Sequence, residues 1–200
     1  ILKEDTLAGH LEITEALHHS FSGTWEQIWG EDRIVENNYH EMTIRVQKTS
    51  TPKRKFNVVF RLFNDGFGFR YEFPEQEALK DFVIMDELTE FALTGDHKAW
   101  SIPYEAHFYE ALYEASPVSK LGWVSTPLTM ETNDGLFLSI HEANLTHYAA
   151  MNLIPKEGSM TLKANLTPWS TGEKVFMKAP GVTPWRTMIV AESAGDLLLS

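Results

Sequence analysis

The sequence of 200 residues contains no cysteine. This absence excludes disulfide bonds, zinc sites with cysteine ligands, iron–sulfur clusters and thiol catalysis. Basic residues are also scarce. The chain has 17 Lys and Arg and 28 Asp and Glu, which gives a formal net charge of −11. A chain this acidic is poorly suited to gripping phosphate backbones, so we expect no nucleic-acid partner. No apolar run approaches the roughly 20 residues that a membrane helix needs, so we also expect no membrane span.

Signals at the two ends are missing as well. The chain begins at Ile1 without an initiator methionine or a signal peptide, and it stops at Ser200 in an apolar, strand-like run. We therefore interpret it as a piece of a longer polypeptide. Aromatic residues, in contrast, are plentiful, with 12 Phe, 6 Tyr and 6 Trp. This content is typical of β-rich proteins and of proteins that bind sugar rings.

The dominant hydrophobic period is two, which predicts half-buried strands. Strand-like runs cover residues 39–46, 56–63, 67–73, 82–85, 88–93, 107–113, 128–131, 136–141, 160–166 and 186–191. Turn signals at Asp65-Gly66 and Asn133-Asp134-Gly135 predict tight hairpins, in which glycine would supply a positive φ. Helix signals are weak, and the single candidate, residues 103–115, also alternates like a strand. The pattern predicts an all-β fold, a large antiparallel sandwich with at most one or two short helices.

The segment around Glu142 is the richest in groups that could bind a metal or move a proton. On an alternating strand, Leu136, Leu138 and Ile140 share one face, and Glu142 continues that apolar face. A carboxylate there needs a cation, an arginine or a metal as its partner, unless it is simply a solvated strand end. The nearby His141 and His147 do not follow a known zinc spacing and lack an evident third ligand, so zinc is disfavoured.

A second candidate segment, residues 94–104, places His97, Trp100 and Tyr104 in an expected loop. Aromatic faces beside charged hydrogen-bonding groups would suit a sugar, although Trp100 and Tyr104 could equally anchor the loop to the core. The stretch Thr183-Pro184-Trp185-Arg186 places a rigid turn before a large anchor, which favours packing. The sequence contains no phosphate-binding glycine loop, no nucleophile elbow and no identifiable pair of catalytic carboxylates.

Four blocks of the sequence resemble one known family. Residues 63–74, 94–105, 138–146 and 183–188 are similar, in this order, to the N-terminal domain of glycoside hydrolase family 97. The resemblance extends from about Trp25 to Ser200. It implies a β super-sandwich, similar to galactose-mutarotase-like domains, placed ahead of a (β/α)8 catalytic barrel.

The resemblance also implies an activity and a site. Family members are calcium-dependent, exo-acting α-glucosidases or α-galactosidases, mostly periplasmic in bacteria, and their acid and base or nucleophile lie in the barrel. The resemblance makes Glu142 a calcium ligand that the N-terminal domain contributes to the shared active site. The candidate substrate-binding residues in the matching blocks are His97, Trp100, Tyr104 and Asn144. The remaining calcium ligands would come from the barrel, since calcium takes six to eight oxygen ligands.

We therefore expect residues 1–200 to form one N-terminal domain that lacks the family's first strands and is inactive on its own. Its partners would be an oligosaccharide substrate and its own C-terminal catalytic barrel. Two alternatives remain open. One is a non-catalytic carbohydrate-binding module with Trp100 and Tyr104 as its platform. The other is a mutarotase-like sugar epimerase, which would need its own acid and base.

Overall fold

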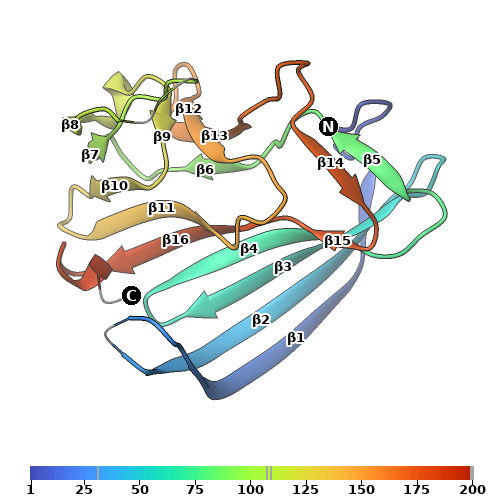
Figure 1. The fold of residues 1–200 in the computed structure, drawn as a ribbon, viewed down its shortest axis with the longest axis horizontal. Helices are drawn as coiled ribbons and strands as arrows, with labels where there is room; N and C mark the ends of the chain where they lie inside the picture. The colour runs from blue at the N-terminus through green and yellow to red at the C-terminus, as the bar shows by residue number, and fades with distance from the viewer. Residues whose placement is uncertain (31, 107, 109, 199–200) are drawn as a thin grey trace.

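The computed structural model describes residues 1–30, 32–106, 108 and 110–198, and strands dominate it (Figure 1). Two single turns of 3-10 helix, Val118–Lys120 and Asp196–Leu198, accompany the strands. The strands are β1 (Leu11–Glu26), β2 (Ile34–Lys48), β3 (Lys55–Phe63), β4 (Gly66–Phe73), β5 (Asp81–Ile84), β6 (Glu90–Ala92), β7 (Lys98–Ser101), β8 (Glu114–Pro117), β9 (Val124–Ser125), β10 (Leu128–Glu131), β11 (Phe137–Ala143), β12 (Met151–Pro155), β13 (Thr161–Leu166), β14 (Val175–Lys178), β15 (Gly181–Val182) and β16 (Trp185–Ala191).

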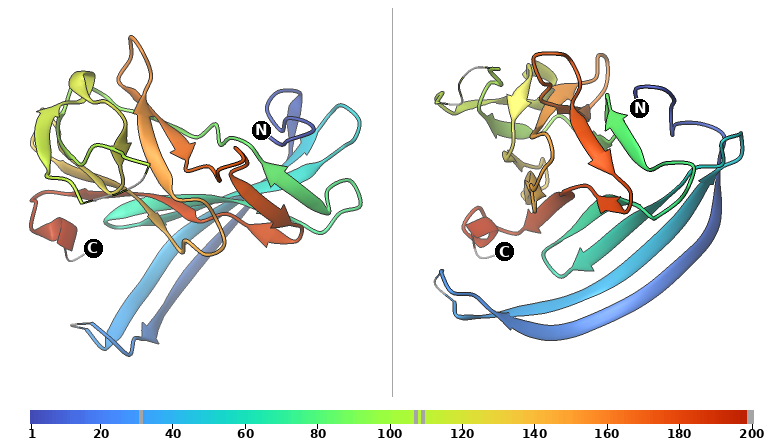
Figure 2. Two further views of the ribbon diagram at one scale, coloured as in Figure 1. Left: turned by 45° about the horizontal axis from the view of Figure 1, so that its top comes forward. Right: turned by 45° about the vertical axis from the view of Figure 1, so that its right-hand side comes forward.

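One large antiparallel sheet forms the base of the molecule. Its ten strands follow the order β1-β2-β3-β4-β16-β11-β10-β7-β8, and β15 pairs with β4. The first four strands are consecutive hairpins, whereas β16 inserts next to β4 from the far end of the chain. The long β1–β2 hairpin curves away from the rest of the sheet (Figure 2). Both faces of β1 are therefore exposed along nearly its whole length.

Two smaller sheets cover one face of the large sheet and close the core. They are the four-stranded sheet β6-β13-β12-β9 and the two-stranded sheet β14-β5. The central core contains side chains from both layers, namely Ala99, Leu128, Met130 and Ile140 from the large sheet and Phe91, Val124, Met151, Leu153, Leu162 and Ala164 from the four-stranded sheet. The strand alternation explains this packing, because residues two apart point to the same face. The all-β, antiparallel sandwich predicted from the sequence is confirmed.

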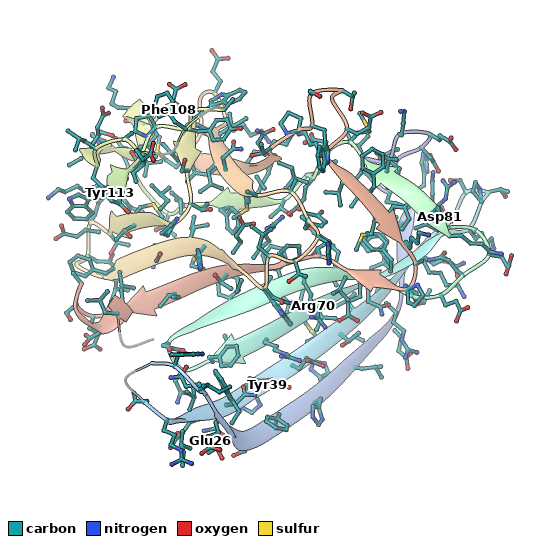
Figure 3. The ribbon with its side chains drawn as sticks, in the orientation of Figure 1. Glu26, Tyr39, Arg70, Asp81, Phe108 and Tyr113 are labelled. Atoms are coloured by element: carbon teal, nitrogen blue, oxygen red, sulfur yellow. The ribbon has the colours of Figure 1, made fainter. Side chains whose placement is uncertain are left out.

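The opposite face of the large sheet carries a ladder of aromatic rings and arginines. The Arg61 guanidinium lies 4.3 Å from the centre of the Tyr39 ring and 4.8 Å from that of Trp185, and Arg70 lies 4.6 Å from Trp185. Tyr39 and Arg70 are labelled in Figure 3. Such cation–π contacts contribute about 0.5–1 kcal/mol each at exposed sites. The ladder thereby stabilises a sheet face that lies outside the sandwich core.

Both expected hairpins are present, and Gly66, with φ 159°, has the expected positive φ and a second role as well. Gly135 has φ 89° between β10 and β11, as the turn chemistry predicted. Gly66 lies after the Asn64-Asp65 turn, where it is the first residue of β4 and pairs with Phe63. A Cβ atom at Gly66 would lie 2.3 Å from the Met188 carbonyl oxygen. Gly66 thus also permits the close approach of β16, which the turn signal did not predict.

We expect Gly66→Ala to destabilise the domain by about 2–4 kcal/mol, because the methyl group meets backbone that cannot move without breaking the β4–β16 ladder. Gly122→Ala is the matched control, since a Cβ atom at Gly122 meets nothing within 4 Å. Urea denaturation of the two variants measures the difference. Equal midpoints for the two variants would show that β16 shifts freely at this position.

The predictions fail in the stretch between β7 and β9. The helix candidate at 103–115 and the strand at 107–113 are both wrong for the part that the structure describes, since residues 104–106, 108 and 110–113 are irregular and β8 begins at Glu114. His107 and Tyr109 lie outside the described residues. Phe108 is 50% exposed and Leu112 is 87% exposed. These apolar side chains do not enter the core. Burial therefore imposes neither the helical period of 3.6 residues nor the strand period of two on this segment.

Candidate functional site

Glu142 lies on the buried face of the large sheet, near the end of β11. It is paired in register with Arg186 on β16, and Ile140, two residues earlier, is fully buried. Its Oε2 accepts a hydrogen bond from Arg186 Nη1 at 2.7 Å, and its Oε1 accepts one from the Met151 backbone N–H at 3.0 Å. The side chain is only 8% exposed. Glu142 is therefore a partnered, largely buried carboxylate rather than a solvated strand end.

Arg186 joins Glu142 to a second buried carboxylate, Glu87, which precedes β6. Arg186 is fully buried and donates from Nε to Glu87 Oε1 at 2.8 Å and from Nη2 to Glu87 Oε2 at 2.7 Å. Glu87 also accepts hydrogen bonds from the hydroxyl groups of Thr89 at 2.8 Å and Tyr148 at 3.3 Å. Sequence reasoning did not single out Glu87, and it assigned Arg186 only to a packing anchor.

The charge of this network is not balanced by the side chains within it. One guanidinium faces two carboxylates, which leaves a formal charge of 1 − 2 = −1 for Arg186, Glu87 and Glu142. Burial alone would lower the pKa of Arg186, but the hydrogen bonds and charge of Glu87, followed by the charge of Glu142, raise it above its ordinary value. Burial, reinforced by the charge of Glu87, holds the pKa of the Tyr148 phenol well above its usual range. Arg186 and Tyr148 therefore stay protonated, so the formal charge of −1 counts only the guanidinium and the two carboxylates.

A small cavity adjoins the Glu142 carboxylate. It has a volume of about 330 Å3, and its lining includes Tyr104, Glu105, Thr126, Glu142 and Asn152. Glu105 is a second carboxylate that the sequence did not single out. Tyr104 is held in place because its backbone N–H donates to the Trp123 carbonyl at 2.9 Å and its hydroxyl lies 3.3 Å from that of Thr167. Tyr104 and Glu142 were both named from the sequence, and the structure brings them to one cavity.

Asn152 at this cavity has a fixed amide orientation. Lys174 can only donate, so it requires the oxygen of Asn165, which it contacts at 3.0 Å. The Asn165 amide nitrogen then donates to Asn152 Oδ1 at 3.0 Å. Asn152 Nδ2 is consequently left as a buried donor without a hydrogen-bond partner. A buried donor of this kind costs free energy unless an acceptor satisfies it.

The other candidates from the sequence lie apart from this cavity. Trp100 belongs to β7, not to a loop, and the Lys98 ammonium lies 4.4 Å from its ring centre. His97 is buried, with Nε2 3.2 Å from the Thr94 hydroxyl. Asn144 is exposed and adopts φ 58° in the turn that follows β11. Trp100 and Tyr104 thus occupy different surroundings.

The donor atoms at the cavity fit part of a calcium site. Carboxylate oxygens, amide and backbone carbonyl oxygens and water are the ligands that calcium takes. In the described part of the chain, however, no group of three or more His, Asp or Glu side chains is placed to hold a metal ion. Glu142 can therefore supply one ligand of a complete calcium site but not the whole site.

Among the described residues, no helix is long and apolar enough to cross a membrane.

The fold is an antiparallel sandwich in which a largely buried carboxylate, Glu142, borders a cavity lined by both polar and apolar residues. The family model described as "Glycosyl-hydrolase 97 N-terminal" matches residues 1–200, and the chain belongs to this family. The fold matches that of a glycoside hydrolase family 97 enzyme from Pseudoalteromonas sp. strain K8, solved in complex with acarbose, with a TM-score of 0.93 and 36% identity. That match covers 99% of this chain and 30% of the other.

Curated relatives give the same assignment. The chain is 27% identical over 150 residues to a retaining alpha-galactosidase of Bacteroides thetaiotaomicron, which covers 68% of this chain. It is 29% identical over 143 residues to a probable retaining alpha-galactosidase of Streptomyces bingchenggensis, which covers 70% of this chain. In both cases the match spans 21% of the relative. The matched part of the chain thus spans about a fifth of the length of these enzymes.

Proposed function

We propose that this chain is the N-terminal domain of a calcium-dependent, exo-acting α-glycosidase, and that Glu142 contributes one calcium ligand where the domain meets a catalytic barrel. The observation that carries the proposal is the formal surplus of negative charge at Glu142, a largely buried carboxylate beside a cavity that Tyr104 and Glu105 also line. A buried surplus charge is unfavourable until a cation offsets it. The similarity to retaining α-galactosidases and to a family 97 glycoside hydrolase supports the assignment to the glycosidases.

The chain's own residues would hold and orient this ligand. The Met151 N–H and the Arg186 guanidinium bind one oxygen of Glu142 each, so that the carboxylate plane is fixed before any cation binds. A bound calcium ion would stabilise negative charge and position the substrate. The neighbouring Tyr104 and Asn152 offer a hydroxyl group and a buried amide donor on the same cavity.

The reaction we propose is hydrolysis of a terminal α-linked hexose by two carboxylates, through an oxocarbenium-like transition state. We place both carboxylates in the barrel, outside residues 1–200. The retaining α-galactosidases among the relatives and the acarbose complex of the Pseudoalteromonas enzyme both support an α-glycoside as substrate. By family resemblance we also propose a periplasmic location, which fractionation of the producing bacterium would test.

The proposed position of both catalytic carboxylates in the barrel gives a direct prediction. Residues 1–200 alone should show no hydrolysis of aryl α-glucosides or aryl α-galactosides above buffer, whereas the full-length protein should hydrolyse at least one of them and lose that activity on calcium chelation. Release of the aryl group measures both. Turnover by the purified domain would place the catalytic groups within residues 1–200. Anomerisation of free sugar by the domain would instead indicate an epimerase.

A further inference from the structure

The Arg186 guanidinium is shared unequally between two carboxylates, Glu87 and Glu142. Glu87 takes two of its hydrogen bonds, from Nε and Nη2, whereas Glu142 takes one, from Nη1. We propose that Glu87 is a positioning residue for cation binding: it holds Arg186 and offsets its charge, so that Glu142 keeps its negative charge for the cavity. This inference rests on the proposed function, because it presumes that Glu142 binds calcium.

Glu87 has the properties that such a role requires. Its side chain is only 5% exposed, and its two oxygens accept hydrogen bonds from Arg186, Thr89 and Tyr148. The Thr89 hydroxyl lies in turn 2.9 Å from that of Tyr71. Glu87 is absent from the described residues that line the Glu142 cavity. It therefore makes no contact within this cavity and can influence a bound cation through its hold on Arg186 and through its charge.

The connection of Glu87 to the fold explains why it can hold Arg186 so firmly. Glu87 lies between β5 and β6, which belong to the two smaller sheets, whereas Arg186 and Glu142 belong to neighbouring strands of the large sheet. The bidentate contact thus spans both layers of the sandwich. A planar guanidinium that is fixed on two sides has little freedom to turn toward Glu142.

The charges predict what happens when Glu87 is neutralised. Without a charge at position 87, Arg186 and Glu142 form a one-to-one ion pair and the surplus of −1 disappears. A divalent cation at Glu142 would then meet an unopposed guanidinium 2.7 Å from one of its ligand oxygens. If both Glu87 and Arg186 are neutral, Glu142 keeps an unshared charge and its bond from the Met151 N–H. The pair of variants therefore separates charge balance from mere stability.

The test is calcium titration by calorimetry on the metal-depleted full-length protein, with folding checked by circular dichroism. We expect Glu87→Gln to raise the calcium Kd about tenfold or more, which is the range typical of outer-shell changes. The double variant Glu87→Gln/Arg186→Gln should return the Kd to within about threefold of wild type. Asp86→Asn is the matched control, because Asp86 pairs with Lys163 and Lys174 instead of Arg186, and its Kd should be unchanged.

The outcomes are distinct. Wild-type calcium affinity in folded Glu87→Gln, or a double variant that binds as weakly as Glu87→Gln, would overturn the role of Glu87. If Glu87→Gln does not fold, the double variant decides alone, and a Kd more than tenfold above wild type would refute the inference. A wild-type Kd in Glu142→Gln would instead remove the proposed calcium site itself. Weaker binding in Glu142→Gln together with unchanged binding in Glu87→Gln would overturn only the positioning role.

Discussion

Arg186→Met is expected to remove about 3–5 kcal/mol from the free energy of unfolding of the domain, because it leaves Glu87 and Glu142 buried without their cation. Arg186 is fully buried and makes three charge-assisted hydrogen bonds of 2.7–2.8 Å. Methionine fills much of the same volume but can donate none of them. Since whole domains are stable by about 5–15 kcal/mol, this loss would be a large part of the total.

Chemical denaturation of the domain measures the effect, with Lys156→Met as the matched control. Lys156 also pairs with a glutamate, Glu90, at 3.1 Å, but their side chains are 58% and 40% exposed. Exposed pairs of this kind contribute at most about 1 kcal/mol, so the control should unfold almost like wild type. A similarly small loss in Arg186→Met would mean that water reaches the Glu87–Arg186–Glu142 network and that its charges are not truly buried.

Local patterns in the sequence were sufficient for much of the fold. The runs at 56–63 and 67–73 appear as β3 and β4, because their alternating aromatic residues and the intervening turn are all local signals. The strand β1 was missed for the opposite reason. It is exposed on both faces, so burial does not impose an alternating pattern on its residues. Neither could sequence alone show that Gly66 is required by β16, which lies more than 100 residues away along the chain.

The candidate site shows the same division between local and distant information. Alternation correctly placed Glu142 on the face of Leu138 and Ile140, and the need for a charged partner followed from that burial. The partner itself, Arg186, is 44 residues away and was not identified. A local signal did exist, since Arg186 is in phase with Met188 along β16 and so points to the buried face. Glu87 offered no comparable signal, because it lies outside any strand.

Glu142→Gln in the full-length protein is expected to raise the calcium requirement about 100-fold or more and to lower activity at limiting calcium. This exceeds the tenfold to hundredfold effect of losing an outer-shell partner, because a direct anionic ligand is lost. The amide keeps the shape of the side chain and can still accept from Arg186 or Met151. The sandwich should therefore fold, since Arg186 keeps its bidentate contact with Glu87.

The decisive measurement is glycosidase activity as a function of free calcium for wild type and Glu142→Gln, with thermal unfolding of both proteins measured in parallel. Glu157→Gln, at an exposed position in the turn between β12 and β13, is the matched control for loss of one carboxylate charge. Activity that recovers at high calcium in Glu142→Gln would identify a lost ligand, whereas activity that stays low at every calcium concentration would indicate a direct role in catalysis or substrate binding. If the calcium titrations and maximal rates of wild type and Glu142→Gln coincide, Glu142 is a purely structural partner of Arg186, and the surplus charge must be offset in some other way.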